Sequence, residues 1–340
     1  MDKKILSTAI AGVLAGSMAF AANADVTLYG QLDVSVDSTD IDGAGDDVNM
    51  NSNFSAIGVK GSEDLGNGLK AIFMVEFQTD LTEGGGSGGV SGRDRWVGLE
   101  GGFGKVRFGA MSTTYKATGA MIDPLWRTAF DTRNGGLVSA LHGGNGDDGQ
   151  GRTSNAIAYD TPSFGGFSAA ATYSFDDDCS AATASCTNPD DDTYSVGARY
   201  KNGPVLAFVD YVTNDQGGSD DAWKVGGKFN FGDFAVFGQY EFDGGLISTG
   251  AGLNPGNTIE DADVWTLGGS FTMGNIMLTA SYAQSDDDND PTFNAEYDAW
   301  RIAGAYNFSK RTMMYAGFNQ IDAEDDGEMD HFAVGMRHKF

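Results

Sequence analysis

The sequence predicts an all-β protein, a sixteen-stranded antiparallel up-and-down β-barrel that spans a membrane and carries an inward-folded third loop. Three observations support this fold class. Sixteen segments alternate between apolar and polar residues, and the connections between them alternate between short and long. Beyond residue 24 there is no run of about 20 apolar residues that could form a transmembrane helix, and no segment has convincing helical periodicity. Short turns on one side and long loops on the other are typical of outer-membrane barrels.

Residues 1–24 have the pattern of a cleaved signal peptide. Lys3 and Lys4 precede an uncharged run from Ile5 to Ala21, and Ala22-Asn23-Ala24 fits the small-x-small cleavage rule. A membrane anchor is the alternative, but the uncharged run has only 17 residues, many of them Ala, Gly or Ser. We therefore expect an exported protein in which residues 25–340 form one barrel domain.

The first predicted strand shows the alternation most clearly. Across residues 26–37, Val, Leu and Gly occupy one face, and Thr, Tyr, Gln, Asp and Ser occupy the other. Twelve residues is long for an ordinary strand but suits a tilted strand that crosses a bilayer. The predicted strands are 26–37, 52–61, 69–79, 93–100, 104–111, 153–160, 166–175, 193–201, 204–213, 222–231, 233–242, 264–273, 275–284, 297–308, 311–321 and 331–340.

Charge separates the two kinds of connection. The long connections contain 34 acidic and 4 basic residues. This distribution predicts a water-facing outer rim, and the formal net charge of −27 argues against nucleic acid as a partner. The long connections are 38–51, 80–92, 112–152, 176–192, 214–221, 243–263, 285–296 and 322–330.

Aromatic residues mark the strand ends near the short turns, which is typical of interfacial girdles in lipid. These residues are Phe103, Phe164, Phe167, Phe231, Phe234, Phe308 and Phe340, and Trp96, Trp223, Trp265 and Trp300 join them elsewhere. A soluble β-sandwich core is the alternative, but sixteen such strands with polar opposite faces favour the membrane.

Residues 112–152 form the longest stretch without strand alternation. A structureless connection of this length is usually functional, and it carries charges of both signs. We expect it to fold into the barrel and narrow the bore. Asp123 and Asp131 are candidates for the acidic side of the constriction, with Arg127 and Arg133 beside them; the alternative is that these four only pair with each other and shape the loop.

Cys179 and Cys186 are the only cysteines and lie in an acidic, polar stretch. An exported protein meets an oxidising compartment, so we expect a disulfide between them. A metal site is the weaker interpretation, because two thiols do not complete a tetrahedral shell. We expect no cofactor, although the Asp triplets 176–178, 190–192 and 286–288 could bind Ca²⁺ or Mg²⁺ loosely.

The chain resembles the Gram-negative general porins, trimeric sixteen-stranded barrels of the outer membrane. Residues 58–71 match the first hairpin of that family, and residues 97–99, 102–104 and 106–109 resemble the second. Val26-Thr27-Leu28-Tyr29-Gly30 and the C-terminal Phe340 also fit. The resemblance implies passive passage of ions and small hydrophilic solutes, an inward-folded third loop, a homotrimer, and outer-membrane lipid and lipopolysaccharide as surroundings.

The resemblance also implies a basic cluster on the barrel wall opposite the loop acids. Arg93, Arg95 and Arg107 fall at matching positions, and alternation relative to Trp96, Val106 and Phe108 predicts that they face inward, as does Lys60. Each Arg could instead form a structural pair with a neighbouring strand. Many family members have Arg where this chain has Ala56, so the basic wall is thinner here.

Three other functions compete with open diffusion. Gly85-Gly86-Ser87-Gly88-Gly89 fits the G-x-S-x-G pattern of a hydrolase, but the strand–turn–helix that this motif needs is missing. Residues 143–148 contain one G-G-x-G-x-D unit of a calcium-binding solenoid, which would need several copies. A substrate-specific channel keeps the same barrel and remains the nearest alternative.

Overall fold

The computed structural model describes residues 24–43, 45–82, 90–133, 135–142, 151–175, 194–214, 220–242, 263–286, 296–323 and 327–340. Among these residues the fold is almost entirely strand. The strands are β1 Ala24–Ile41, β2 Gly45–Ser52, β3 Ala56–Gly66, β4 Leu69–Thr79, β5 Val90–Gly101, β6 Gly104–Ser112, β7 Arg152–Asp160, β8 Phe167–Ser174, β9 Tyr194–Asn202, β10 Val205–Asn214, β11 Asp220–Phe231, β12 Phe234–Phe242, β13 Asp263–Met273, β14 Ile276–Asp286, β15 Tyr297–Asn307, β16 Thr312–Ala323 and β17 Gly327–Lys339.

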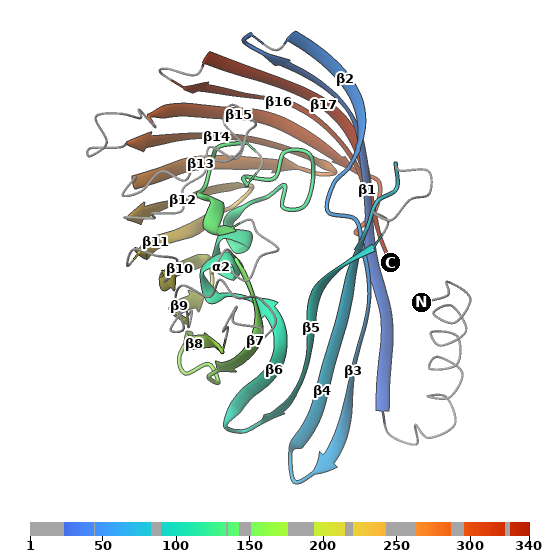
Figure 1. Cartoon of the computed structure of the whole chain (residues 1–340), viewed down its shortest axis with the longest axis vertical. Helices are drawn as coiled ribbons and strands as arrows, with labels where there is room; N and C mark the ends of the chain where they lie inside the picture. The colour runs from blue at the N-terminus through green and yellow to red at the C-terminus, as the bar shows by residue number, and fades with distance from the viewer. Residues whose placement is uncertain are drawn as a thin grey trace, which may run out of the picture.

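The strands close into an antiparallel barrel (Figure 1). Each strand from β4 to β16 pairs with its sequence neighbours, and β1 pairs with β17 from Gln31↔Lys339 to Ile41↔Met329. On its other edge β1 pairs with both β2 and β3. The strands β2 and β3 therefore share one place in the wall, which confirms the predicted sixteen-stranded barrel.

The predicted long connection 38–51 is wrong. Residues 38–41 continue β1, and residues 45–51 belong to β2, which pairs with β1 up to Ile41↔Gly45. Likewise β16 extends to Ala323 and β17 begins at Gly327, so most of 322–330 is strand. Polar residues at these strand ends conceal the alternation that marks a strand.

The place in the wall that β2 and β3 share is interrupted at residues 53–55, between the two strands. Here Phe54 adopts a left-handed backbone with φ +50°, while the Asn53 backbone N–H donates to the Asp33 carbonyl (2.9 Å). The Ser55 hydroxyl accepts from the Asp33 backbone N–H (2.9 Å). These contacts replace the ladder bonds lost at the break, and they let Phe54 leave the plane of the sheet.

Burial confirms that apolar side chains face out and polar ones face in. Leu28 is 61% exposed and Phe229 is 46% exposed, whereas Lys224 on the opposite face of β11 is fully buried. A soluble protein has the reverse arrangement, because apolar burial drives its folding. The Phe residues expected near the short turns are exposed on the outside: Phe103, Phe164, Phe167, Phe231, Phe234, Phe308 and Phe340.

The third connection folds into the barrel, as predicted, and contains a helix that was not predicted. Helix α2 (Thr114–Ile122) begins after Thr113, whose side chain accepts from the Lys116 backbone N–H. It contacts β8 to β12, and Figure 1 shows it within the curve of these strands. A single 3-10 turn, η1, spans Ala140–His142. No helix in the described part of the chain is long and apolar enough to cross a membrane.

Candidate functional site

The loop between β6 and β7 crosses the bore, and polar contacts fix its helical side to β10, β11 and β12. Tyr115 Oη donates to Glu241 Oε2 (2.8 Å), and the Ser139 backbone N–H donates to Glu241 Oε1 (3.1 Å). Lys224 Nζ donates to His142 Nε2 (2.8 Å) and also to the Tyr115 carbonyl. Burial, and then the Lys224 ammonium, hold the pKa of His142 well below its usual range, so its ring is a neutral acceptor.

A second group of contacts holds the rest of the loop to β15, β16, β17 and β1. Arg301 forms an ion pair with Asp123 (Nη1 to Oδ1, 3.3 Å) and also donates to the Phe130 carbonyl. Arg337 Nη1 donates to the Trp126 carbonyl (2.7 Å), and Gln31 Nε2 donates to the Arg127 carbonyl (3.0 Å). The wall thus binds loop backbone as well as loop side chains, which holds the loop across the bore.

The loop acids do not face the passage as predicted. Asp131 has no exposed surface, and Arg133 holds it through Nε to Oδ1 (2.8 Å) and Nη2 to Oδ2 (2.6 Å). Burial acts to raise the pKa of Asp131, but the Arg133 guanidinium and the hydrogen bonds from the Arg127 and Arg133 backbone N–H groups together lower it. Asp123 is also buried, and burial raises its pKa against the attraction of Arg301. Asp131 therefore matches the alternative in which the loop acids pair within the loop and shape it, whereas Asp123 pairs with Arg301 of the barrel wall.

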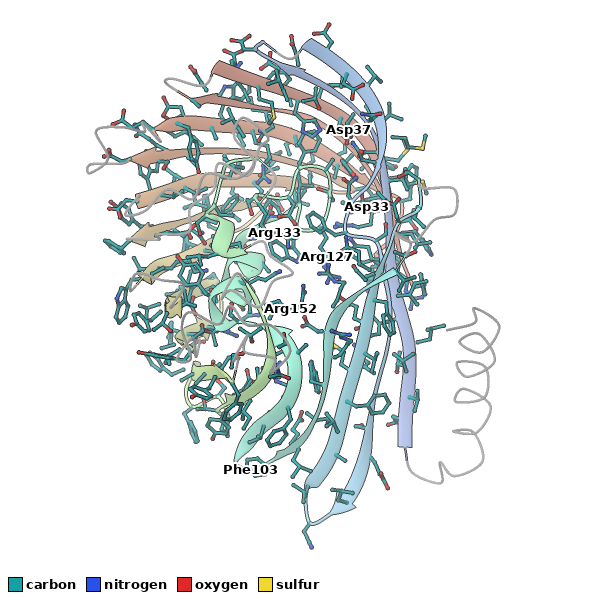
Figure 2. The ribbon with its side chains drawn as sticks, viewed as in Figure 1. Asp33, Asp37, Phe103, Arg127, Arg133 and Arg152 are labelled. Carbon is teal, nitrogen blue, oxygen red and sulfur yellow. The ribbon has the colours of Figure 1, made fainter. Side chains whose placement is uncertain are left out.

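Arg133 lies between two aromatic rings. Its guanidinium carbon is 3.9 Å from the centroid of Trp126 and 4.1 Å from that of Phe54, the residue at the break in the second strand. Figure 2 shows Arg127, Arg133 and Arg152 gathered within the barrel. Since an arginine that is ion-paired and stacked on two rings has little freedom, Arg133 serves to hold the loop in place.

The predicted basic wall divides into buried and accessible members. Arg93 is buried and bonds to Glu76 through Nε (2.6 Å), and Arg127 bonds to the same carboxylate oxygen through Nη2 (2.7 Å). Arg107 pairs with Asp160 (2.8 Å) but keeps part of its surface exposed. Lys60 is exposed on the inner face of β3, with its ammonium 5.0 Å from the Tyr29 ring centroid.

The prediction that Arg95 faces inward is wrong. The ladder between β4 and β5 shifts, with Val75 opposite Arg95 but Phe77 opposite Gly92. This bulge turns both Arg93 and Asp94 inward, where Asp94 accepts from Arg152 Nε (2.8 Å). Alternation resumes one residue out of phase, because a bulge inserts an extra residue into one strand.

The shift leaves Arg95 exposed on the outer face, in register with outward Val75. It also moves Trp96, which we expected in the outer girdle, to the inside. There its ring lies 5.4 Å from the Arg107 guanidinium carbon.

An open pocket of about 400 Å³ lies where the loop edge faces the first and last strands. Its lining includes Arg127 and Trp126 from the loop, and Arg337 and Lys339 from β17. Arg337 and Lys339 were not among the cations expected to line the bore. Their positions on β17, alternating with outward Met336 and His338, were the available signal.

Other predicted sites are only partly covered by the described residues. Cys179, Cys186, the Gly85–Gly89 motif and the Asp triplets other than Asp286 lie outside them. Within them, no group of three or more His, Cys, Asp or Glu side chains is placed to hold a metal ion. The expected disulfide and the expected loose binding of divalent cations therefore stay predictions.

Comparisons with known proteins agree with this geometry. A family model described as Gram-negative porin matches residues 7–326. The major outer membrane protein P.IB of Neisseria meningitidis serogroup B is 30% identical over 368 aligned positions that cover all of both chains. The solved structure of an anion-selective porin from Comamonas acidovorans has a TM-score of 0.73 at 26% identity, over 93% of this chain and 100% of that one. Salmonella typhi OmpF, in complex with daunomycin, shares the fold with a TM-score of 0.74 at 15% identity, over 93% and 97% of the two chains.

Proposed function

The chain belongs to the Gram-negative porin family, and from this premise we propose that it acts as a homotrimer whose channels favour small anions at the third-loop constriction. The protein is an outer-membrane diffusion channel of a Gram-negative bacterium, not an enzyme. The inverted burial of the barrel carries this function: the polar inner faces keep the bore wet, and the closed ladder leaves none of the described strands with a free edge in lipid.

The anion preference is supported by the charges that remain accessible inside the barrel. Lys60 and Lys339 are exposed, and Arg107 and Arg127 are partly exposed, whereas the loop acids Asp123 and Asp131 are buried. The partly exposed carboxylates Asp160 and Asp94 are each neutralised by an arginine, Arg107 and Arg152. Rings of one charge sign tune selectivity in narrow pores. The Comamonas acidovorans relative is described as anion-selective, which fits the same sign.

The reversal potential in a planar bilayer under a KCl gradient tests this preference. We expect a potential of the sign that chloride permeation produces, and Lys60→Glu should move it toward the potassium value. Lys310→Glu is the matched control, since it reverses one exposed charge in the short turn between β15 and β16 and should leave the potential unchanged. A wild-type channel that favours potassium would contradict the proposed preference.

The homotrimer is supported by the outward position of Arg95. This residue is exposed beside Val97, which is also exposed. A charge on the lipid face of a barrel costs up to about 2–4 kcal/mol at mid-depth, so a neighbouring copy that covers it would lower the free energy of the assembly. OmpT of Vibrio cholerae, which shares the fold, is described in a trimer form. The mass of the detergent-solubilised protein, corrected for bound detergent, should equal three chains; a monomer mass would contradict this.

Outer-membrane lipid and lipopolysaccharide are the proposed surroundings of the remaining wall. The exposed Phe residues near the short turns and the exposed Trp223 on β11 support this, because aromatic rings favour the bilayer interfaces. A substrate-specific channel remains the second candidate. Its conductance would reach a plateau as the concentration of any salt rises, whereas the conductance of an open diffusion channel is proportional to KCl concentration.

A further inference from the structure

The open pocket of about 400 Å³ lies at the place where the barrel closes. One side comes from the loop edge at residues 123–127, and the other from β1, β3, β4 and β17. Ala56 contributes only a methyl group to the wall here, which leaves room for a small molecule. The lining residues are Tyr29, Gly30, Gln31, Ala56, Glu76, Asp123, Pro124, Trp126, Arg127, Arg337 and Lys339.

Three cations line this pocket: Arg127 from the loop, and Arg337 and Lys339 two residues apart on β17. The two acids in the lining already have cationic partners outside it. Glu76 accepts from Arg93 (2.6 Å) as well as from Arg127 (2.7 Å), and Asp123 pairs with Arg301 (3.3 Å). The pocket with its immediate partners is therefore positively charged.

Neither Arg337 nor Lys339 forms an ion pair with a carboxylate of the described residues, although the buried Asp33 lies opposite Arg337 in the ladder between β1 and β17. Arg337 donates to the Trp126 carbonyl (2.7 Å) and to the Met313 sulfur (3.1 Å), both of which are uncharged. Among the described residues, no carboxylate lies within ion-pair distance of Arg337 or Lys339. Lys339 is exposed, so its ammonium is available to a solute.

We propose that this pocket is a binding subsite for the oxyanion group, a carboxylate or a phosphate, of a small solute that passes through the channel. Arg127 and Arg337 offer planar guanidinium donors, and Lys339 adds a mobile ammonium; charge-assisted hydrogen bonds from such groups are the stronger kind. Because the pocket is open, the oxyanion binds transiently and then moves on. This subsite rests on the proposed function and makes it more specific. It differs from the basic wall on β3, β5 and β6, because its cations come from the loop and from the last strand.

Competition with the chloride current tests the subsite. Sodium succinate or inorganic phosphate is added to the reconstituted wild-type protein in constant KCl, and each should reduce the current to a saturating level. Lys339→Gln, which removes an exposed charge without a carboxylate partner, should raise the half-inhibiting concentration about tenfold, the factor that 1.4 kcal/mol produces. Arg337→Gln with Lys339→Gln should abolish saturation. Lys105→Gln is the matched control, because Lys105 is a partly exposed cation on β6 whose ion-pair partner, Glu100, lies outside the pocket lining.

The outcomes separate the possible ligands and the two proposals. Saturation by both probes supports a shared oxyanion subsite, and saturation by one assigns it to carboxylates or to phosphates. A conducting channel that neither probe inhibits, or equal inhibition of Lys339→Gln and wild type, overturns the subsite and leaves the diffusion channel intact. If the protein does not conduct, calorimetric titration of the detergent-solubilised trimer with phosphate decides: binding that Lys339→Gln weakens supports the subsite while the channel proposal fails, and no binding overturns both.

Discussion

Lys224 and Lys60 both point into the barrel, but the loop covers Lys224 and leaves Lys60 exposed. Lys224 on β11 is fully buried beneath the loop, with His142 at 2.8 Å and the Tyr115 ring centroid at 4.1 Å. Lys60 on β3 is exposed, and its ammonium lies 5.0 Å from the Tyr29 ring centroid. Charges in the bore therefore differ in whether the loop covers them: covered charges hold the loop in place, and uncovered charges are accessible from the bore.

Removal of the middle of the loop should widen the bore. Deletion of residues 120–139 removes the segment that contacts β13 to β17 and β1, so the bore should widen and admit larger neutral sugars. Liposome swelling with sugars of increasing size measures the limit. Circular dichroism controls for an intact barrel, and an unchanged limit in a folded variant would show that the loop is not the constriction.

Substitution of the two lysines tests the comparison directly. Lys224→Met leaves Glu241 and Asp210 buried without their cation, and breaking such a buried pair costs about 3–5 kcal/mol. Lys60→Met removes an exposed charge and should change the free energy of unfolding by less than about 0.5 kcal/mol. Urea-induced unfolding in detergent measures both. Equal losses in the two variants would contradict the division into anchoring and solute-facing charges.

The Arg133 contact should depend on pH in a defined direction. Arg133 lowers the pKa of Asp131 in the folded protein, so its stabilisation is present above the unfolded Asp value of about 3.9 and is lost as pH falls through the folded value. Arg133→Gln should cost about 2 kcal/mol at pH 7, as expected for hydrogen bonds to a charged group.

Thermal melting of both proteins between pH 7 and pH 3 measures this dependence. The gap between wild type and Arg133→Gln should narrow at acid pH. Arg133→Lys is the control that keeps the charge but not the planar fork, and it should recover part of the gap. A gap that widens toward acid pH would exclude an ionised Asp131 as the partner.

Strand positions were predictable because alternation is a local property of the chain. The same property failed at the β5 bulge, where one extra residue reversed the orientation of Arg95 and Trp96. No sequence signal within a few residues of Asp94 predicts this shift in register, because the shift depends on how β4 pairs with β5.

The roles of the loop acids could not be predicted, because their partners are distant in sequence. Asp123 meets Arg301, which is 178 residues away, and His142 meets Lys224, which is 82 residues away. The helix had one local signal, Thr113 as an N-cap, but nine residues are too few for a clear helical period. Packing in three dimensions, rather than local pattern, determined which charges became accessible.

The wide span of the loop contacts has a consequence for the order of assembly. The loop touches β1 and every strand from β9 to β17, including Ala129 with Tyr315 across 186 residues and Trp126 with Arg337 across 211. Contacts between such distant segments form late, because closing a long stretch of chain costs conformational entropy before the stabilising contacts are made. During biogenesis the nascent barrel should therefore pass through a wide-bore intermediate, and the narrowing should lock only when the first and last strands have met.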